Sequence, residues 1–235
     1  MTKVAINGFG RIGRAFLKIA WERPELEIVA VNDLGSIDSL AYLLRHDTVY
    51  RNWGHDVKVD GANLVIDGKV VKFVSEKDTT KLPWGELGID VVVESTGLFT
   101  AYDKAKFHID CGAKKVVISA PAKGSDGSVP GETILLGVNE EKFGTVDITS
   151  NASCTTNAAS PLIAILHDKI GIEKAILNTV HGYTASQALV DGPSKKDLRE
   201  GRAAAQNIVP SSTGAAIAVT KAFPDLTDKF DGISI

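Results

Sequence analysis

The 235-residue sequence predicts an α/β fold in which a doubly wound parallel sheet is followed by a smaller α+β domain. Three observations support this prediction. Short apolar runs alternate along the chain with amphipathic stretches of helical periodicity. Several of these runs are apolar throughout, which is typical of parallel strands covered on both faces. The first run also leads through a glycine-rich turn directly into a helical stretch. We expect the domains to span residues 1–149 and 150–235.

The composition narrows the function classes. Hydrophobic residues make up 44% of the chain and charged residues 23%, an ordinary balance for a globular protein. Because the net charge is −3 and no long basic run occurs, we expect no nucleic-acid partner. Two cysteines argue against a disulfide framework and for a reducing compartment. With no signal peptide or spanning segment in the sequence, we expect a cytoplasmic protein without a membrane partner.

The first element is a predicted dinucleotide site. Residues 3–7 form an apolar run, the glycines of the G-x-G-x-x-G pattern are Gly8, Gly10 and Gly13, and residues 14–21 follow as a helical stretch. Strand, glycine turn and helix in this order are the context that dinucleotide binding requires, because the glycines let a pyrophosphate approach the helix N-terminus. An ordinary strand–helix turn is the alternative.

An acidic residue supports the cofactor prediction. The next predicted strand, residues 26–32, ends at Asp33, which lies 20 positions after Gly13. A carboxylate at this spacing accepts hydrogen bonds from the ribose hydroxyls and repels a 2′-phosphate. The sequence therefore favours NAD over NADP.

Later elements of the first half complete the sheet. We expect a helix over 37–45, a hairpin of 63–66 and 69–74 around Asp67-Gly68, and buried strands over 89–94 and 115–119. In the earlier helix over 14–21, we expect one apolar side formed by Ala15, Phe16, Ile19 and Ala20. Ligands bind beyond the carboxyl ends of parallel strands, so Thr96 and Ser119 are candidates for the nicotinamide half of the cofactor. Ordinary turn chemistry explains each of them equally well.

A cysteine at the start of a predicted helix is the candidate nucleophile. The stretch 150–157 follows an apolar run, 146–148, and precedes a helical stretch over 158–170. Ser153 is a suitable N-cap, which places Cys154 in the first turn, where the helix dipole stabilises a thiolate. A buried, inert cysteine is the alternative, and we assign that role to Cys111, which precedes Gly112 at a probable helix end.

A histidine at a strand end is the candidate base. The predicted strand over 175–180 ends at His181, followed by Gly182, Tyr183 and Thr184. The other four histidines lie in polar or helical stretches without a partner motif: His46, His55, His108 and His167. We therefore pair His181 with Cys154, whose thiol an imidazole can activate.

The second half also offers two anion sites. A long polar loop over 186–207 carries Lys195, Lys196, Arg199 and Arg202, and Ser211-Ser212-Thr213-Gly214 precedes a helical stretch over 215–223. Backbone N–H groups at such a helix start suit a phosphate, although a solvated loop and simple N-capping are the alternatives. A hydride acceptor, a thiol, a base and anion sites together indicate oxidation of a phosphorylated aldehyde.

At these motifs the chain resembles the phosphorylating glyceraldehyde-3-phosphate dehydrogenase family of the glycolytic type. The matches lie at residues 7–14, 150–157, 191–194, 202–207 and 211–216. The resemblance implies a Rossmann-type NAD-binding domain and an α+β catalytic domain. It also implies the conversion of glyceraldehyde 3-phosphate and inorganic phosphate to 1,3-bisphosphoglycerate through a cysteine thioester, by a homotetramer.

The resemblance assigns roles to individual residues. It implies Cys154 as nucleophile and His181 as its activator; Arg11, Ile12, Asp33, Lys77 and Ser119 at NAD; and Ser153, Thr155, Thr184, Arg202, Thr213 and Gly214 around the two phosphates. Lys77 stands where the family commonly has arginine, and Ala158 replaces a second cysteine often found there. No metal site is implied.

The family pattern also continues past Ile235. It supplies an arginine for the substrate phosphate, an asparagine for the nicotinamide, further strands and a final helix. We therefore expect an incomplete catalytic domain that binds NAD weakly and turns over poorly by itself. Two alternatives stay open: an erythrose-4-phosphate dehydrogenase, which Thr213-Gly214 and residues 191–194 disfavour, and an NAD-binding protein without turnover.

Overall fold

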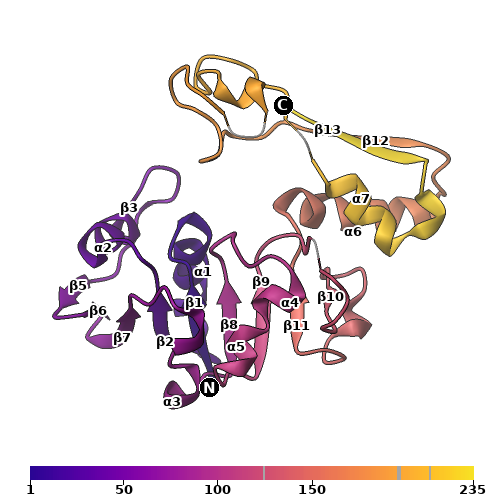
Figure 1. Cartoon of the computed structure of the whole chain (residues 1–235). Coiled ribbons are helices and arrows are strands. Elements are labelled where there is room, and N and C mark those ends of the chain that lie inside the picture. Colours follow the sequence, from indigo (N-terminus) through magenta and orange to yellow (C-terminus); the bar gives the residue numbers. More distant parts are fainter. Residues whose placement is uncertain (124, 195–196, 212) are drawn as a thin grey trace. The chain divides into compact units, whose positions relative to one another are not determined.

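The computed structural model describes residues 1–123, 125–194, 197–211 and 213–235. It divides into two compact units (Figure 1): residues 1–134 with 141–152, and residues 135–140 with 153–235. Each unit is described by itself. Lys195, Lys196 and Ser212, which we predicted at an anion site, lie outside the described residues.

The first unit is built on a sheet whose strand order, over the described residues, is β10-β11-β9-β8-β1-β2-β7-β6-β5. Its strands are β1 (Thr2–Asn7), β2 (Leu26–Asn32), β5 (Val57–Asp60), β6 (Asn63–Ile66), β7 (Lys69–Val74), β8 (Val91–Glu94), β9 (Lys115–Ile118), β10 (Glu132–Thr133) and β11 (Ile148–Ser150). All pairings from β10 to β7 are parallel, and β5 and β6 add an antiparallel edge. The predicted doubly wound sheet is confirmed, with its topological switch between β1 and β8 (Figure 1).

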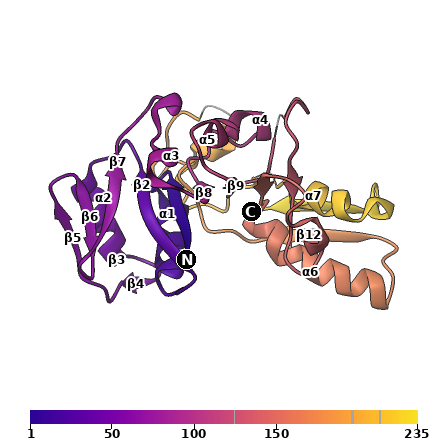
Figure 2. The ribbon, with the colours of Figure 1, turned by 90° about the horizontal axis from the view of Figure 1, so that it is seen from below.

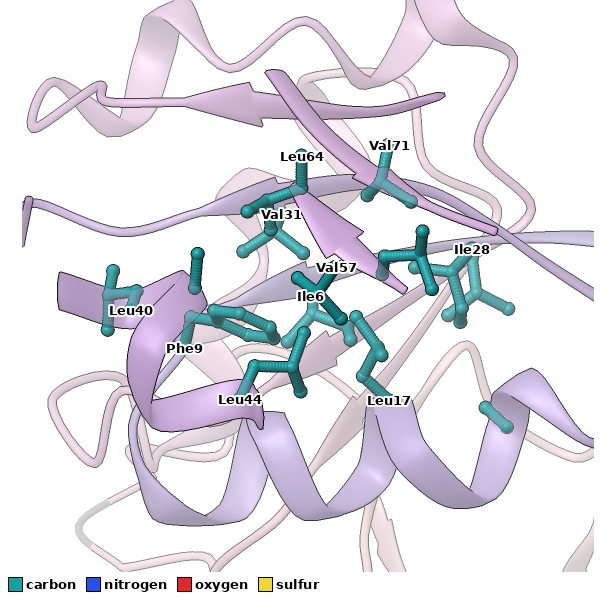
Figure 3. Close-up of a cluster of buried hydrophobic side chains, with 14 of the residues drawn as sticks. Ile6, Phe9, Leu17, Ile28, Val31, Leu40, Leu44, Val57, Leu64 and Val71 are labelled. Atoms are coloured by element: carbon teal, nitrogen blue, oxygen red, sulfur yellow. The ribbon is translucent and has the colours of Figure 1, made fainter. Parts of the chain in front are cut away.

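Helices cover both faces of this sheet. They are α1 (Arg11–Trp21), α2 (Ile37–Arg45), α3 (Trp84–Leu87), α4 (Tyr102–Ala105) and α5 (Phe107–Asp110), with 3₁₀ turns at Thr79–Lys81 and Glu140–Lys142 and a small antiparallel pair, β3 (His46–Asp47) and β4 (Arg51–Asn52). Successive side chains of β1 point to opposite faces of the sheet, so the hydrophobic core has two parts. Ile6 packs with Leu17 of α1 and Leu44 of α2 (Figure 3), while Ala5 packs on the other face with Trp84.

Helix α1 corrects one expectation. It begins at Arg11 rather than residue 14, and its buried stripe is Gly13, Leu17 and Ala20. Ile19, which we expected on the apolar side, is 65% exposed. The stripe follows from Gly13: a Cβ built there would lie 2.1 Å from the Gly8 carbonyl oxygen, so the backbone at Gly13 packs against the turn and sets which face points inward. A smaller correction concerns β11, which begins at Ile148, where we expected a strand to end.

The predicted hairpin turn is confirmed. Strands β6 and β7 pair antiparallel, with Ile66 opposite Lys69. Both residues between them have positive φ, 48° at Asp67 and 79° at Gly68. This is the conformation of a type I′ turn, for which Asp-Gly is a preferred pair.

The described residues of the second unit form two α-helices packed on a two-stranded parallel sheet. The elements are α6 (Cys154–Lys169), β12 (Ala175–Thr179), α7 (Ala215–Ala222) and β13 (Phe230–Ser234), with 3₁₀ turns at Leu198–Gly201 and Pro224–Leu226. Helices α6 and α7 lie side by side (Figure 2), and Ile163, Val219 and Phe230 pack between helices and strands. In neither unit do the described residues include a helix with the length and apolarity to cross a membrane.

Candidate active site

The N-terminus of α6 presents Cys154. Ser153 precedes it in an extended conformation, with φ −101° and ψ 163°, and its Oγ accepts the Thr156 N–H at 3.0 Å. The predicted N-cap is thus confirmed. Because a cap fixes where the helix begins, it places Cys154 at the first helical position, where unpaired N–H groups and the helix dipole favour negative charge. The side chain of Cys154 is exposed.

His181 reaches this thiol from the end of β12. Its backbone N–H donates to the Ile235 carbonyl at 2.8 Å, so the residue is tied to the strand end of β13. Its ring Nδ1 lies 2.5 Å from the Gly182 carbonyl oxygen, and its Nε2 lies 3.5 Å from Sγ of Cys154. A carbonyl only accepts, so Nδ1 carries a proton, and Nε2 is the nitrogen that exchanges a proton with the thiol.

The two groups shift each other's ionisation. Burial acts to raise the pKa of Cys154, but hydrogen bonds with His181 and Thr155 outweigh it and bring that pKa below its ordinary value. The Gly182 carbonyl, and then Cys154, raise the pKa of His181. Both shifts favour a thiolate beside an imidazolium, the pairing that activates cysteine nucleophiles.

Cys111 has the opposite environment. It follows α5, and its Sγ donates to the Thr79 carbonyl at 3.1 Å. Burial raises the pKa of its thiol, and the nearby Asp110 carboxylate acts in the same direction. The thiol of Cys111 is therefore kept protonated, in agreement with the packing role that we expected for it.

The predicted phosphate residues occupy different parts of the second unit. Thr155 lies beside the thiol, with its Oγ1 4.0 Å from Sγ of Cys154. Thr213 Oγ1 accepts the Ala215 N–H at 3.2 Å, and Gly214 is the N-cap of α7. Ser211 pairs with Ser234, the last residue of β13, and the next residue, Ile235, accepts the backbone N–H of His181. The chain that leads to α7 and His181, two residues after β12, therefore both bond at the C-terminal end of β13.

Two other predicted residues do not join the thiol. Arg202 Nε donates to Asp191 Oδ1 at 3.1 Å, so its guanidinium already has an anionic partner. Thr184 bonds locally, through its N–H to Gln187 and its hydroxyl to Ser186. Among the described residues, no hydrogen bond links Arg202 or Thr184 to Cys154 or His181.

In the first unit, a cleft of about 430 Å³ opens at the carboxyl ends of the strands. Its walls include five residues that we predicted at the cofactor: Gly8, Gly10, Asp33, Lys77 and Thr96. Strands β1 and β8 flank the topological switch, where open α/β sheets bind ligands. A larger groove, of about 620 Å³, lies between α1 and Trp53 but contains no predicted site residue.

The glycine turn fits a dinucleotide phosphate. Gly8 has φ +92°, and a Cβ there would lie 2.6 Å from the Thr96 nitrogen, so only glycine fits this backbone. A Cβ on Gly10 would meet nothing within 4 Å. Gly10 is the N-cap of α1, where backbone N–H groups attract phosphate. Because no protein atom fills the space beside Gly10, a pyrophosphate has room to approach the backbone there.

Hydrogen bonds hold three of the cofactor candidates, Asp33, Arg11 and Ser119. Asp33 accepts the Phe9 N–H at Oδ2 and the Gly35 N–H at Oδ1, each at 2.7 Å, which orients its carboxylate at the cleft. Arg11 pairs with Asp47 at 2.5 Å, and Ile12 is 52% exposed. Ser119 Oγ donates to the Glu94 carbonyl at 3.0 Å. The walls of the cleft include none of Arg11, Ile12 and Ser119.

Four buried polar residues in or beneath the walls of this cleft were missed by the sequence analysis. Asn7, Asn32 and Glu94 end three neighbouring strands, and His108, for which the sequence offered no partner motif, lies fully buried against Glu94. A polar residue at the end of an apolar run was the available signal for the first three. Within the described residues, no cluster of three or more His, Cys, Asp or Glu side chains is arranged to hold a metal ion.

Two family models match the chain. The family model described as "Glyceraldehyde 3-phosphate dehydrogenase, NAD binding domain" matches residues 2–102, and the one described as "Glyceraldehyde 3-phosphate dehydrogenase, C-terminal domain" matches residues 153–235.

Individual relatives match along the whole chain. Glyceraldehyde-3-phosphate dehydrogenase 1 of Kluyveromyces lactis is 51% identical over 235 residues, which cover 100% of this chain and 70% of the relative. Glyceraldehyde-3-phosphate dehydrogenase 1 of Bacillus subtilis is 50% identical over 232 residues, covering 98% of this chain and 68% of the relative. The chain belongs to the glyceraldehyde-3-phosphate dehydrogenase family.

Proposed function

We propose that this chain carries the activity of its family, the NAD-dependent oxidation of glyceraldehyde 3-phosphate with inorganic phosphate to 1,3-bisphosphoglycerate in glycolysis. The observation that carries the proposal is the 3.5 Å approach of Cys154 Sγ to His181 Nε2 at the N-terminus of α6. A lowered thiol pKa beside a histidine is the arrangement that covalent aldehyde oxidation needs.

Proton transfers follow from this geometry. The thiolate of Cys154 attacks the aldehyde carbon, an S–C bond forms, and the imidazolium of His181 gives its Nε2 proton to the carbonyl oxygen. The neutral imidazole then takes that proton back as the oxygen re-forms its double bond, leaving a thioester on Cys154. Bound NAD supplies the acceptor for the hydride that leaves the same carbon. A phosphate oxygen then attacks the thioester, and the thiolate of Cys154 leaves.

The remaining assignments are proposals of the same kind. Ser153, Thr155, Thr184, Arg202, Thr213 and Gly214 bind the two phosphates, and Gly8, Gly10, Arg11, Ile12, Gly13, Asp33, Lys77, Thr96 and Ser119 bind NAD. The helix starts at Cys154 and Gly214 support the phosphate sites, because the first-turn N–H groups of a helix have no acceptor within the helix. Residues 1–149 then serve NAD binding and residues 150–235 catalysis, in a cytoplasmic homotetramer.

The test is phosphate dependence. Purified protein is mixed with NAD and glyceraldehyde 3-phosphate, and NADH formation is followed with and without phosphate. Without phosphate we expect at most one NADH per Cys154, because the thioester accumulates. Steady turnover without phosphate would contradict the proposal, and faster phosphate-independent oxidation of erythrose 4-phosphate would favour that alternative. NAD binding with no NADH at all would indicate a binding protein without turnover.

A further inference from the structure

A line of hydrogen-bonded polar groups crosses the sheet beneath the cofactor cleft. It runs along the carboxyl ends of four adjacent strands, β7, β2, β1 and β8, and continues into α5 and α3. We call it the polar belt, and its members are the Glu76 backbone and the side chains of Asn32, Asn7, Glu94, His108 and Trp84. All five side chains are less than a tenth exposed. Buried polar groups of this kind are costly unless each has a partner.

Every bond of the belt has the length of a well-formed hydrogen bond. The Glu76 N–H donates to Asn32 Oδ1 at 2.9 Å, and Asn32 Nδ2 donates to Asn7 Oδ1 at 2.8 Å. Asn7 Nδ2 then donates to Glu94 Oε2 at 2.6 Å. From the other side, Trp84 Nε1 donates to His108 Nδ1 at 2.9 Å, and His108 Nε2 lies 3.0 Å from Glu94 Oε2. The hydrogen bonds from both ends of the belt therefore meet at the carboxylate of Glu94.

The hydrogen-bond donors around His108 determine which of its ring nitrogens carries the proton. Indole Nε1 can only donate, so His108 Nδ1 is an acceptor and the ring is the Nε2–H tautomer, which donates to Glu94. Burial lowers the pKa of His108, although Glu94 acts to raise it, so the ring stays neutral. On the other side, the Glu76 N–H fixes the orientation of the Asn32 amide, and Asn32 fixes that of Asn7.

Glu94 also controls the wall of the cleft. Its Oε1 accepts both the N–H and the hydroxyl of Thr96, at 2.8 and 2.5 Å. The Thr96 hydroxyl in turn accepts the Leu98 N–H at 3.1 Å. Asn7, Asn32, Thr96 and Leu98 all line the cleft. Each carboxylate oxygen thus holds two donors, and the strand-end loops on both sides of the topological switch depend on it.

We propose that Glu94 is a positioning residue for NAD, which holds the cleft walls in their binding geometry, with His108 as a neutral donor locked by Trp84. This inference rests on NAD being the ligand of the cleft. Neither Glu94 nor His108 lines the cleft, so both act through Asn7 and Thr96. A positioning role needs the acceptor capacity of Glu94, and not merely its volume, because all four of its donors require an acceptor.

The test uses a substitution that keeps this volume. In Glu94→Gln one carboxylate oxygen becomes an NH₂ group, which faces two donors whichever way the amide turns. We expect NAD affinity, measured by calorimetry on the full chain, to fall at least about tenfold. The matched control is Val92→Ala, which removes core methyl groups from the same strand without touching the belt. It should lower thermal stability but leave NAD affinity within about twofold.

A second measurement needs no variant. The ¹⁵N shifts of His108 in the unmutated chain should show a protonated Nε2 and an unprotonated Nδ1 from about pH 5.5 to 8, below and above the ordinary histidine pKa. An imidazolium or an Nδ1–H tautomer would overturn the proposal. Equal NAD affinity in Glu94→Gln, or an equal loss in Val92→Ala, would overturn it as well. If the unmutated chain binds no NAD, the cofactor assignment fails and the positioning role fails with it, whatever the tautomer.

Discussion

Sγ of Cys154 lies 3.5 Å from Nε2 of His181, and the two residues are 27 positions apart in the chain. Each is oriented by its own neighbours: the thiol by the helix that Ser153 caps, and the ring by the carbonyl of Gly182. The pair therefore depends on two separate local interactions. Losing either one moves a reacting atom, and small displacements of reacting groups are expensive in rate.

The first prediction concerns thiol reactivity. With iodoacetamide at pH 7, Cys154 should be alkylated faster than Cys111, because only the thiolate reacts and the pKa of Cys154 is lowered while that of Cys111 is raised. In His181→Gln the midpoint of the rate–pH profile of Cys154 should move to higher pH. Peptide mass spectrometry of timed samples gives both rates. Preferential labelling of Cys111 in the folded protein would contradict the assignment.

A second prediction separates chemistry from cofactor binding. Cys154→Ser should reduce NADH formation to background, because a serine hydroxyl is not ionised by a histidine at neutral pH to the extent that a thiol is. NAD affinity should stay within about twofold, since the cofactor cleft belongs to the first unit. Calorimetry and an NADH assay on the same preparation measure the two effects. A large loss of NAD affinity in this variant would show that Cys154 also supports the cofactor.

The third prediction concerns Asp33. Its carboxylate accepts N–H groups from Phe9 and Gly35, so a substitution affects both its charge and the glycine turn. Asp33→Asn keeps a side-chain oxygen for one of these bonds and removes the charge that repels a 2′-phosphate. The ratio of NAD to NADP affinity should therefore fall in Asp33→Asn and fall similarly in Asp33→Gly. Fluorescence titration with both cofactors measures it. Equal affinities in the unmutated chain would contradict the ribose assignment.

Features that depend on neighbouring residues could be predicted from the sequence. The Ser153 cap, the Asp67-Gly68 turn and the glycines at 8 and 13 are local: a few adjacent residues set the backbone, and the residue types record it. The parallel strands followed for the same reason, since an apolar run bounded by turns suits a strand with two covered faces.

Features that depend on tertiary packing could not be predicted. Trp84, Glu94 and His108 meet only because α3, β8 and α5 pack together, and singly each suggests ordinary burial or exposure. Ile19 looked apolar and therefore inward, yet Gly13 sets the orientation of α1 and leaves Ile19 exposed. Arg202 was predicted at a phosphate, and the sequence did not reveal that Asp191 lies against it. Periodicity ranks positions on one helix, and it carries no information about partners from other elements.

The last prediction concerns His55, whose ring joins three segments of the first unit. Nδ1 lies 2.6 Å from Asp67 at the β6–β7 turn, and Nε2 lies 2.7 Å from Glu22 after α1. The Asp67 hydrogen bond, against an opposing effect of burial, raises the pKa of His55. Because the folded-state pKa is raised, this stabilisation is complete below about pH 6.5, the unfolded value, and is lost as pH rises through the folded pKa.

His55→Asn should therefore lower the unfolding midpoint more at pH 6 than at pH 9, and its own midpoint should vary less over this range. Asp67→Asn is the matched control, because asparagine tolerates the positive φ of 48° at that position while removing the carboxylate. It should reproduce much of the pH effect without disturbing the turn. Thermal melts of the unmutated chain and the two variants at several pH values measure these effects. If His55→Asn lowered the unfolding midpoint equally at pH 6 and pH 9, His55 would contribute by packing on Trp53, whose ring centroid lies 4.3 Å away, and not by charge.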